Sequence, residues 1–194
     1  MFKQVLLLAA VAFLTLAANS KAHCEIASEP SAPAASPSAS LHSDATQHAG
    51  ELLDEIVTWL SSNFDLPAVK ERPVIAFGSK MKLATMRARD RASTDHGLLE
   101  LGQRQVVALY DDQSRTIWLP DDWAGTSTVD QSVLVHEMVH HLQTLGKLKF
   151  DCPQAREKLA YQAQDEWLHR FGLSLEKEFD VDMFTVLISS ACIY

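Results

Sequence analysis

The sequence has 194 residues, of which 47% are hydrophobic and 22% are charged, with a formal net charge of −8 at pH 7. This length and hydrophobic content suit one globular domain with its own core and leave too little chain for two. The excess of acidic residues argues against nucleic acid or an anionic membrane as a partner.

The first residues have the features of a secretory signal. Lys3 supplies a positive charge, and residues 5–18 form a continuous apolar run, VLLLAAVAFLTLAA, that is shorter than a membrane-spanning helix. Small residues precede a cleavage point after Ala22. We expect residues 1–22 to be removed and the protein to be secreted or periplasmic, without membrane contact after cleavage. An uncleaved membrane anchor is the alternative.

A Pro/Ser/Ala-rich tract separates this segment from the domain. Residues 23–45 contain EPSAPAASPSAS, which has too few apolar residues to fold, and we expect a disordered linker there. The domain is then residues 46–194. Its first helix is predicted over residues 48–62, where apolar residues recur at helical spacing: Leu52, Leu53, Ile56, Val57 and Leu60.

Short strands follow. Residues 73–77 (PVIAF) are predicted to form a buried strand, and residues 80–97 a short helix followed by a loop. Residues 105–110 and 115–119 are apolar, β-branched runs separated by the turn sequence DDQS. This pattern predicts a β-hairpin.

Three helices are predicted after the hairpin. The first spans residues 128–145, with Thr128 or Asp130 as its cap and a glycine at its end. The second spans residues 153–170 and begins at a proline, and the third spans residues 174–189. A helix, a small antiparallel or mixed sheet and three further helices predict an α+β fold.

The three cysteines suggest one disulfide bond. In an oxidising compartment Cys152 and Cys192 are the natural pair, because both lie inside the predicted domain. The bond would fasten the C-terminal tail to the start of the second of these helices and leave Cys24 unpaired in the linker. Three free thiols are the alternative.

The strongest functional signal is the segment HEMVH at residues 136–140. On a helix, His136 and His140 project from the same face one turn apart. Two neutral imidazoles so placed can occupy two positions of a tetrahedral zinc site, and Glu137 is placed to take a proton from water at the metal. The alternative is that both histidines are core or surface residues without a metal.

A catalytic zinc site needs a third protein ligand. The extended metzincin motif cannot supply it, because that motif would place glycine where the chain has Gln143 and histidine where it has Gly146. Glu157, in the first turn of the following predicted helix, is the favoured candidate. Its rivals on that helix are Asp165, Glu166 and His169.

The HEMVH segment and the later EKLAY at residues 157–161 together resemble the gluzincin metallopeptidases, in particular minimal secreted bacterial members. The resemblance implies a zincin-like fold, in which a small sheet packs on an active-site helix and a ligand-bearing helix. It also implies that His136, His140 and Glu157 bind Zn²⁺ and that Glu137 is the general base. A peptide or protein is the implied substrate, bound by strand addition along the outer strand of the hairpin.

The resemblance has one departure. Gluzincins often carry Asp or Asn four residues after the glutamate ligand, where it supports a ligating histidine, whereas this chain has Tyr161. Its phenol could form that hydrogen bond or stabilise a developing oxyanion.

The spacing of the motif residues continues beyond the proposed ligands. His136, His140 and Gln143 form one stripe, and Glu157, Tyr161 and Gln164 form a second with the same i, i+4, i+7 spacing. We expect the two stripes to face each other across the metal, with the glutamines closing a polar seam; solvated glutamines are the alternative. His141 is expected to point away from the site, as a surface or supporting residue.

These features predict an exported zinc-dependent hydrolase, most consistent with a metallopeptidase. The alternative from another class is a catalytically inactive zincin-like domain that binds a metal or a protein partner.

Overall fold

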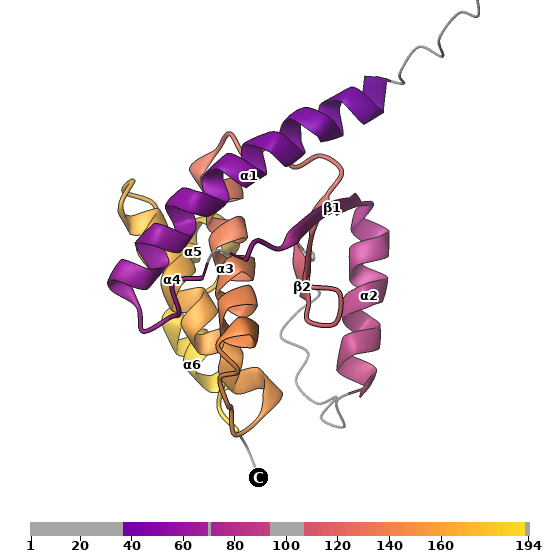
Figure 1. Ribbon diagram of the computed structural model, residues 1–194. Coiled ribbons are helices and arrows are strands. Elements are labelled where there is room, and N and C mark those ends of the chain that lie inside the picture. The colour runs from indigo at the N-terminus through magenta and orange to yellow at the C-terminus, as the bar shows by residue number, and fades with distance from the viewer. Residues whose placement is uncertain (1–36, 70, 94–106, 193–194) are drawn as a thin grey trace, which may run out of the picture. The chain divides into compact units, whose positions relative to one another are not determined.

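The computed structural model describes residues 37–69, 71–93 and 107–192. The predicted signal segment and Cys24 lie outside these residues. In chain order the elements are α1 (Pro37–Asn63), β1 (Val74–Gly78), α2 (Lys80–Ser93), β2 (Leu109–Asp111), β3 (Thr116–Pro120), α3 (Thr128–Leu145), the 3-10 helix η1 (Pro153–Arg156), α4 (Glu157–His169), α5 (Leu175–Phe179) and α6 (Met183–Ser189). This mixture of helices and a small mixed sheet agrees with the α+β class (Figure 1). No helix among the described residues is both long enough and apolar enough to cross a membrane.

Helix α1 is longer than the sequence predicts. Residues 48–62 are helical as expected, and the predicted apolar positions Leu53, Ile56 and Leu60 are buried in the main core. The helix begins at Pro37, however, so the linker prediction is wrong for residues 37–45. The physical reason is contact with the domain. The His42 ring stacks on Phe77 of β1, with centroids 4.8 Å apart, and the segment is thereby held against the sheet.

The sheet has the strand order β1-β3-β2, with β1 parallel and β2 antiparallel to β3. Side chains of β3 alternate between its two faces, as they must along a strand. Ile117 and Leu119 are fully buried in the core shared with α1 and α3. Trp118 lies on the opposite face, where Lys82 of α2 is positioned over its ring. Figure 1 shows α2 and α3 on opposite sides of the strands.

Two strand predictions need correction. The segment expected to be a buried strand is β1, which lies at an edge of the described sheet and leaves Val74 60% exposed. The predicted hairpin is present, but among the described residues its first strand is Leu109–Asp111, and residues 105–106 of the prediction lie outside them. Continuing the pairing register would place residue 107 opposite Pro120, which has no N–H to donate.

Helix α3 carries the HEMVH segment and packs against α1, β2 and α4. Residues 132–143 are all buried, because α3 is covered on all sides rather than along one stripe. Its cap is Ser127, whose side chain accepts a hydrogen bond from the backbone N–H of Asp130 at 3.0 Å. Neither predicted cap, Thr128 or Asp130, holds that position. The predicted end at Gly146 is confirmed.

The predicted second helix has two parts, the 3-10 helix η1 and then α4, which begins at Glu157. The Cys152–Cys192 disulfide is confirmed, with Cα atoms 5.8 Å apart. Cys152 directly precedes η1, so the bond ties the C-terminal end of the chain to the start of the segment that leads into α4.

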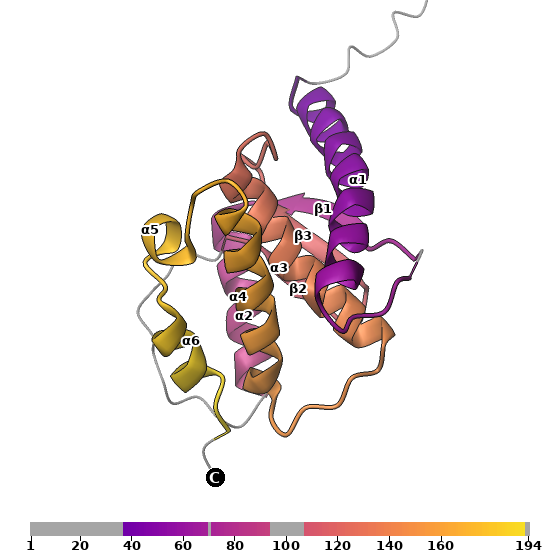
Figure 2. The ribbon, with the colours of Figure 1, turned by 90° about the vertical axis from the view of Figure 1, so that its left-hand side faces the viewer.

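The helix predicted over residues 174–189 is instead two short helices, α5 and α6. Asp180 ends α5 in the left-handed conformation with φ of 55°. Asp182 then caps α6 by accepting hydrogen bonds from the backbone N–H and the hydroxyl of Thr185, at 2.8 and 2.6 Å. Both helices lie beside α4 (Figure 2) and bury Leu175 and Val186 in a second, smaller core.

Candidate metal centre

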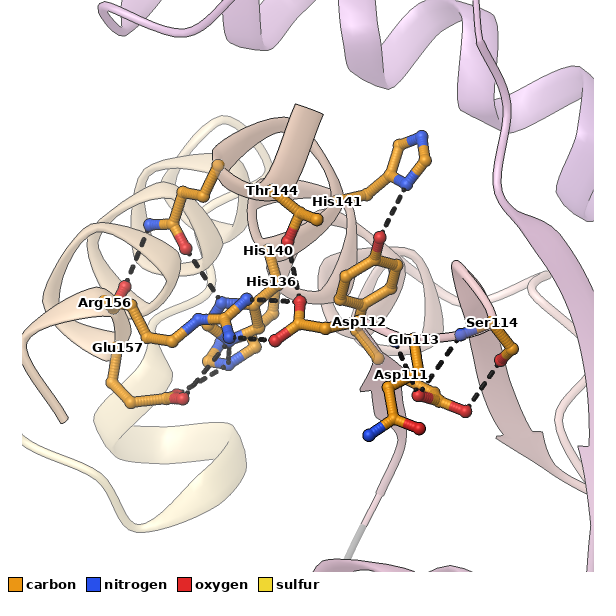
Figure 3. Close-up of polar contacts among 12 residues, drawn as sticks. Asp111, Asp112, Gln113, Ser114, His136, His140, His141, Thr144, Arg156 and Glu157 are labelled. Carbon is orange, nitrogen blue, oxygen red and sulfur yellow. Dashed lines mark hydrogen bonds and ion pairs between the residues drawn. The ribbon is translucent and has the colours of Figure 1, made fainter. Parts of the chain in front are cut away.

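Helices α3 and α4 bring the three predicted metal ligands together. The Nε2 atoms of His136 and His140 are 3.3 Å apart. Glu157, the first residue of α4, places Oε2 3.3 Å from Nε2 of His136 and Oε1 3.4 Å from Nε2 of His140. Figure 3 shows the three side chains pointing toward one another from the two helices. They form a group that could hold a metal ion, with one ligand atom from each residue within 4.8 Å of the others.

The electrostatics of this group fit a cation. Oε2 of Glu157 is buried and receives no hydrogen bond. Burial alone would raise the pKa of Glu157, but the adjacent His140 and His136 lower this pKa well below its usual range, so the carboxylate is ionised. Burial is the largest single influence on His140 and would lower its pKa, but the combined effects of Glu157 and Glu137 raise that pKa. A carboxylate with one buried, unpaired oxygen and two imidazole nitrogens at these distances suit a bound positive charge.

The two glutamines lie where the spacing predicts. Gln143 and Gln164 are buried rather than solvated. The side-chain oxygen of Gln143 lies 3.0 Å from Nδ1 of His140, and that of Gln164 lies 3.1 Å from Nδ1 of His136. The stripes of α3 and α4 therefore face each other, and a glutamine contacts each histidine on the side away from Glu157. The histidine support expected from residue 161 comes from Gln164 instead.

Glu137 and Tyr161 border the same group. Glu137 is 7% exposed, and its charge contributes to raising the pKa of both His140 and Tyr161. The Tyr161 ring packs edge-on against His136, with centroids 4.5 Å apart. The pKa of Tyr161 is raised, first by burial and then by the charge of Glu157, against the opposing charge of Arg87 from α2. The phenol is therefore protonated at neutral pH and can donate a hydrogen bond.

A polar cluster next to Glu157 was not predicted. Arg156 donates two hydrogen bonds to Asp112, at 2.5 and 3.0 Å, and Thr144 donates one to the same carboxylate at 2.6 Å (Figure 3). We call Arg156 and Asp112 the clamp, because they join the turn after β2 to the start of α4. The turn sequence DDQS predicts a hairpin, but it carries no signal for a partner 44 positions away along the chain.

His141 has a structural role. The expectation that it points away from the site agrees with its contacts, but it is fully buried and is not a surface residue. Its Nδ1 lies 3.1 Å from the Tyr110 hydroxyl, and its Nε2 lies 2.9 Å from the backbone carbonyl of Glu71. Because that carbonyl can only accept, Nε2 donates and Nδ1 accepts the phenol proton.

The rival third ligands lie elsewhere on α4. Asp165 accepts a hydrogen bond from the backbone N–H of Leu175 at 2.8 Å and stabilises the start of α5. Glu166 is exposed, and the His169 side chain is 59% exposed. Among the described residues, none of these three is part of the group formed by His136, His140 and Glu157.

The model of one protein family, a domain of unknown function (DUF6647), matches residues 45–194. The chain belongs to this family. No curated protein and no solved structure matches it. Because the family description names no function, a function can be inferred only from the chemistry of the site.

Proposed function

We propose that this protein is a zinc-dependent hydrolase, and specifically a metallopeptidase related to the gluzincins. The observation that carries the proposal is the meeting of His136, His140 and Glu157, with nitrogen–oxygen distances of 3.3 and 3.4 Å, beside the glutamate of an HExxH segment. Structural zinc sites are usually closed by four protein ligands, whereas three protein ligands with an open position are typical of catalytic zinc.

Access to the site supports catalysis over a purely structural ion. The side chain of Glu157 is 32% exposed, whereas those of His136 and His140 are 10% and 7% exposed. The group is thus buried on its histidine side and reachable beside the glutamate. Zinc held by these residues would polarise a substrate carbonyl and lower the pKa of water.

Glu137 is the proposed general base. Its buried carboxylate follows the first histidine of the pair directly in the chain, and its charge acts on His140 and Tyr161. In the proposed reaction Glu137 takes a proton from the attacking water and returns it to the leaving amine, so that the proton is conserved.

Tyr161 is the proposed oxyanion donor. Burial keeps its phenol protonated, and the ring lies against the ligand His136. A hydroxyl held beside the reacting carbonyl can donate to the negative charge that develops on the carbonyl oxygen. The positive charge of Arg87, which acts on the same phenol, would favour that charge further.

The edge of the sheet supports a peptide as substrate. Among the described residues β2 pairs only with β3, so its outer edge has no strand partner. The residue after β2, Asp112, is bonded to Arg156, the neighbour of Glu157, and the edge therefore leads toward the metal centre. An extended peptide could pair with this edge through its backbone.

The deciding experiment combines metal content with hydrolysis. We expect about one zinc per protein purified from cells that express the full chain, and loss of zinc in His140→Ala and Glu157→Ala. Glu137→Gln should keep the zinc and abolish hydrolysis of a peptide library. The matched controls are His169→Ala and Glu166→Gln on the exposed side of α4, which should retain both zinc and activity.

Each outcome separates the candidate functions. Hydrolysis that persists in Glu137→Gln would refute the assigned base. Zinc bound without hydrolysis of any peptide would instead favour a non-catalytic metal-binding domain. A folded wild type that takes up no zinc after supplementation would remove the metal site and the enzyme proposal together.

A further inference from the structure

The side-chain amides of Gln143 and Gln164 support an inference that rests on the metal site proposed above. Each amide oxygen faces Nδ1 of one histidine, at 3.0 Å for His140 and 3.1 Å for His136. A carbonyl oxygen can only accept a hydrogen bond, so the imidazole proton lies on Nδ1 in both rings. In the neutral ring Nε2 then carries the lone pair, which is the form a metal requires.

The far end of each amide supports this orientation. The Gln143 nitrogen donates at 3.0 Å to the backbone carbonyl of Arg156, and a rotated amide would place two oxygens against each other there. The Gln164 nitrogen lies 3.3 Å from the hydroxyl oxygen of Ser132. That hydroxyl donates its own proton to the carbonyl of Val129 at 2.8 Å, so its oxygen accepts from the amide.

Water cannot readily replace either amide. Gln143 is 1% exposed and Gln164 is 4% exposed. Removing the oxygen would leave a buried imidazole N–H without an acceptor, which is a costly arrangement. The two glutamines differ in what else they connect. Gln143 bonds the residue that precedes Glu157, whereas Gln164 joins α4 to Ser132 on α3.

We propose that Gln143 and Gln164 are positioning residues that hold His140 and His136 as Nδ1–H tautomers with Nε2 directed at the metal. Gln143 orients two ligands at once, because one end of its amide holds His140 and the other holds the backbone beside Glu157. Gln164 orients His136 across the contact between the helices.

The test is the zinc dissociation constant of the purified full-chain protein, measured by competition with a chelator. Gln143→Leu and Gln164→Leu remove the acceptor, and each should weaken zinc binding by about 10–100-fold. The matched control is Gln131→Leu, also on α3, whose amide bonds the Gly125 carbonyl at 3.3 Å and no histidine. Its zinc affinity should equal that of the wild type.

Glutamate substitutions separate positioning from packing. Gln164→Glu keeps an acceptor for His136, and the Ser132 hydroxyl can turn to donate to it, so zinc affinity should stay near that of the wild type. Gln143→Glu should not rescue, because its second oxygen would face the Arg156 carbonyl, which cannot donate. If the glutamines served only to pack the core, the buried charge at 164 would do more harm than leucine.

Long-range ¹H–¹⁵N spectra of the zinc-loaded wild type provide a second readout, with the ring proton expected on Nδ1 of both histidines. Protons on Nε2, or leucine variants that bind zinc as tightly as the wild type, would overturn the inference and leave the zinc site intact. If the leucine variants do not fold, the contrast between the two glutamate variants decides, and equal affinities would overturn it. A wild type that binds no zinc refutes the proposed site and this inference with it.

Discussion

The candidate metal centre has two halves that are held in place by different means. His136 and His140 lie within the continuously buried part of α3, so one helix and the core around it place both rings. Glu157 instead begins α4, after an exposed connector at residues 146–151 and the turn η1. Its place depends on links to distant parts of the chain. The histidine half is therefore set by local sequence and burial, and the glutamate half by tertiary bonds, so each half can be broken separately.

The largest loss of stability is expected from a substitution in the core around the helix that carries the histidines. Leu134 on α3 is fully buried, and Leu134→Ala should lower the free energy of unfolding by about 2–5 kcal/mol through lost burial and the cavity left behind. Urea unfolding measures the change. The control is Leu187→Ala on α6, a side chain that is 52% exposed, where the expected loss is about 0.5 kcal/mol or less. Equal losses would show that burial does not hold α3 in place.

The disulfide tests the glutamate half. Replacing both Cys152 and Cys192 by serine opens a loop that spans 40 positions, and should lower the free energy of unfolding by about 3–4 kcal/mol in the chain-entropy model. We expect zinc affinity to fall as well, because η1 loses its anchor just ahead of Glu157. A reductant should reproduce both effects in the wild type and change nothing further in the double variant. Unchanged stability after reduction would contradict the pairing.

This contrast also explains what could be predicted from the sequence. The helix bearing His136 and His140 was predictable, because apolar residues surround the motif and histidines four apart share a face. The same periodicity placed Gln143 and Gln164 at the seam. The residue that caps α3 was harder to predict. Ser127 and the two predicted residues, Thr128 and Asp130, can all cap a helix, and only the packed structure selects one.

The rest depends on tertiary structure. The bonds from Arg156 to Asp112 join residues 44 positions apart and follow no local pattern. The break between α5 and α6 at Asp180 could not be predicted from the apolar residues of α6, because an aspartate in the left-handed conformation gives only a weak sequence signal. The helical start of α1 could not be predicted, because its composition resembles that of a linker. The contact between His42 and Phe77 that favours the helix exists only in the folded domain. The zincin-like fold implied by the resemblance stays a prediction.

Helix α3 also carries a histidine outside the candidate metal centre, His141, that gives the protein a pH signature. Burial lowers the pKa of His141, against the opposing hydrogen bond to the Glu71 carbonyl. An unfolded histidine has a pKa of about 6.5, so below that pH the unfolded chain binds a proton that the folded protein resists. Stability should therefore fall as the pH drops below about 6.5, and thermal unfolding at several pH values measures it. His141→Phe should flatten this dependence. Tyr110→Phe, which keeps the imidazole, should retain it.

The smallest effect is expected at the clamp. Burial alone would raise the pKa of Asp112, but hydrogen bonds from Arg156 and Thr144 lower it below the ordinary value. A carboxyl whose pKa is lowered by folding stabilises the protein above its unfolded pKa of about 3.9, and this stability is lost as the pH falls through the folded pKa. Because the Asp112 side chain is 46% exposed, solvent screening limits the loss in Asp112→Asn to about 1 kcal/mol at pH 7.

Zinc affinity should separate the clamp from an ordinary surface ion pair. Asp112→Asn loosens Arg156, whose backbone carbonyl is bonded to Gln143 and whose neighbour is Glu157, so we expect weaker zinc binding. The control is Asp122→Asn, which breaks the exposed 2.7 Å pair with Lys80 on α2. That variant should bind zinc like the wild type. If both variants bind zinc equally well, the clamp does not hold Glu157, and the disulfide would be the main link that positions the glutamate half.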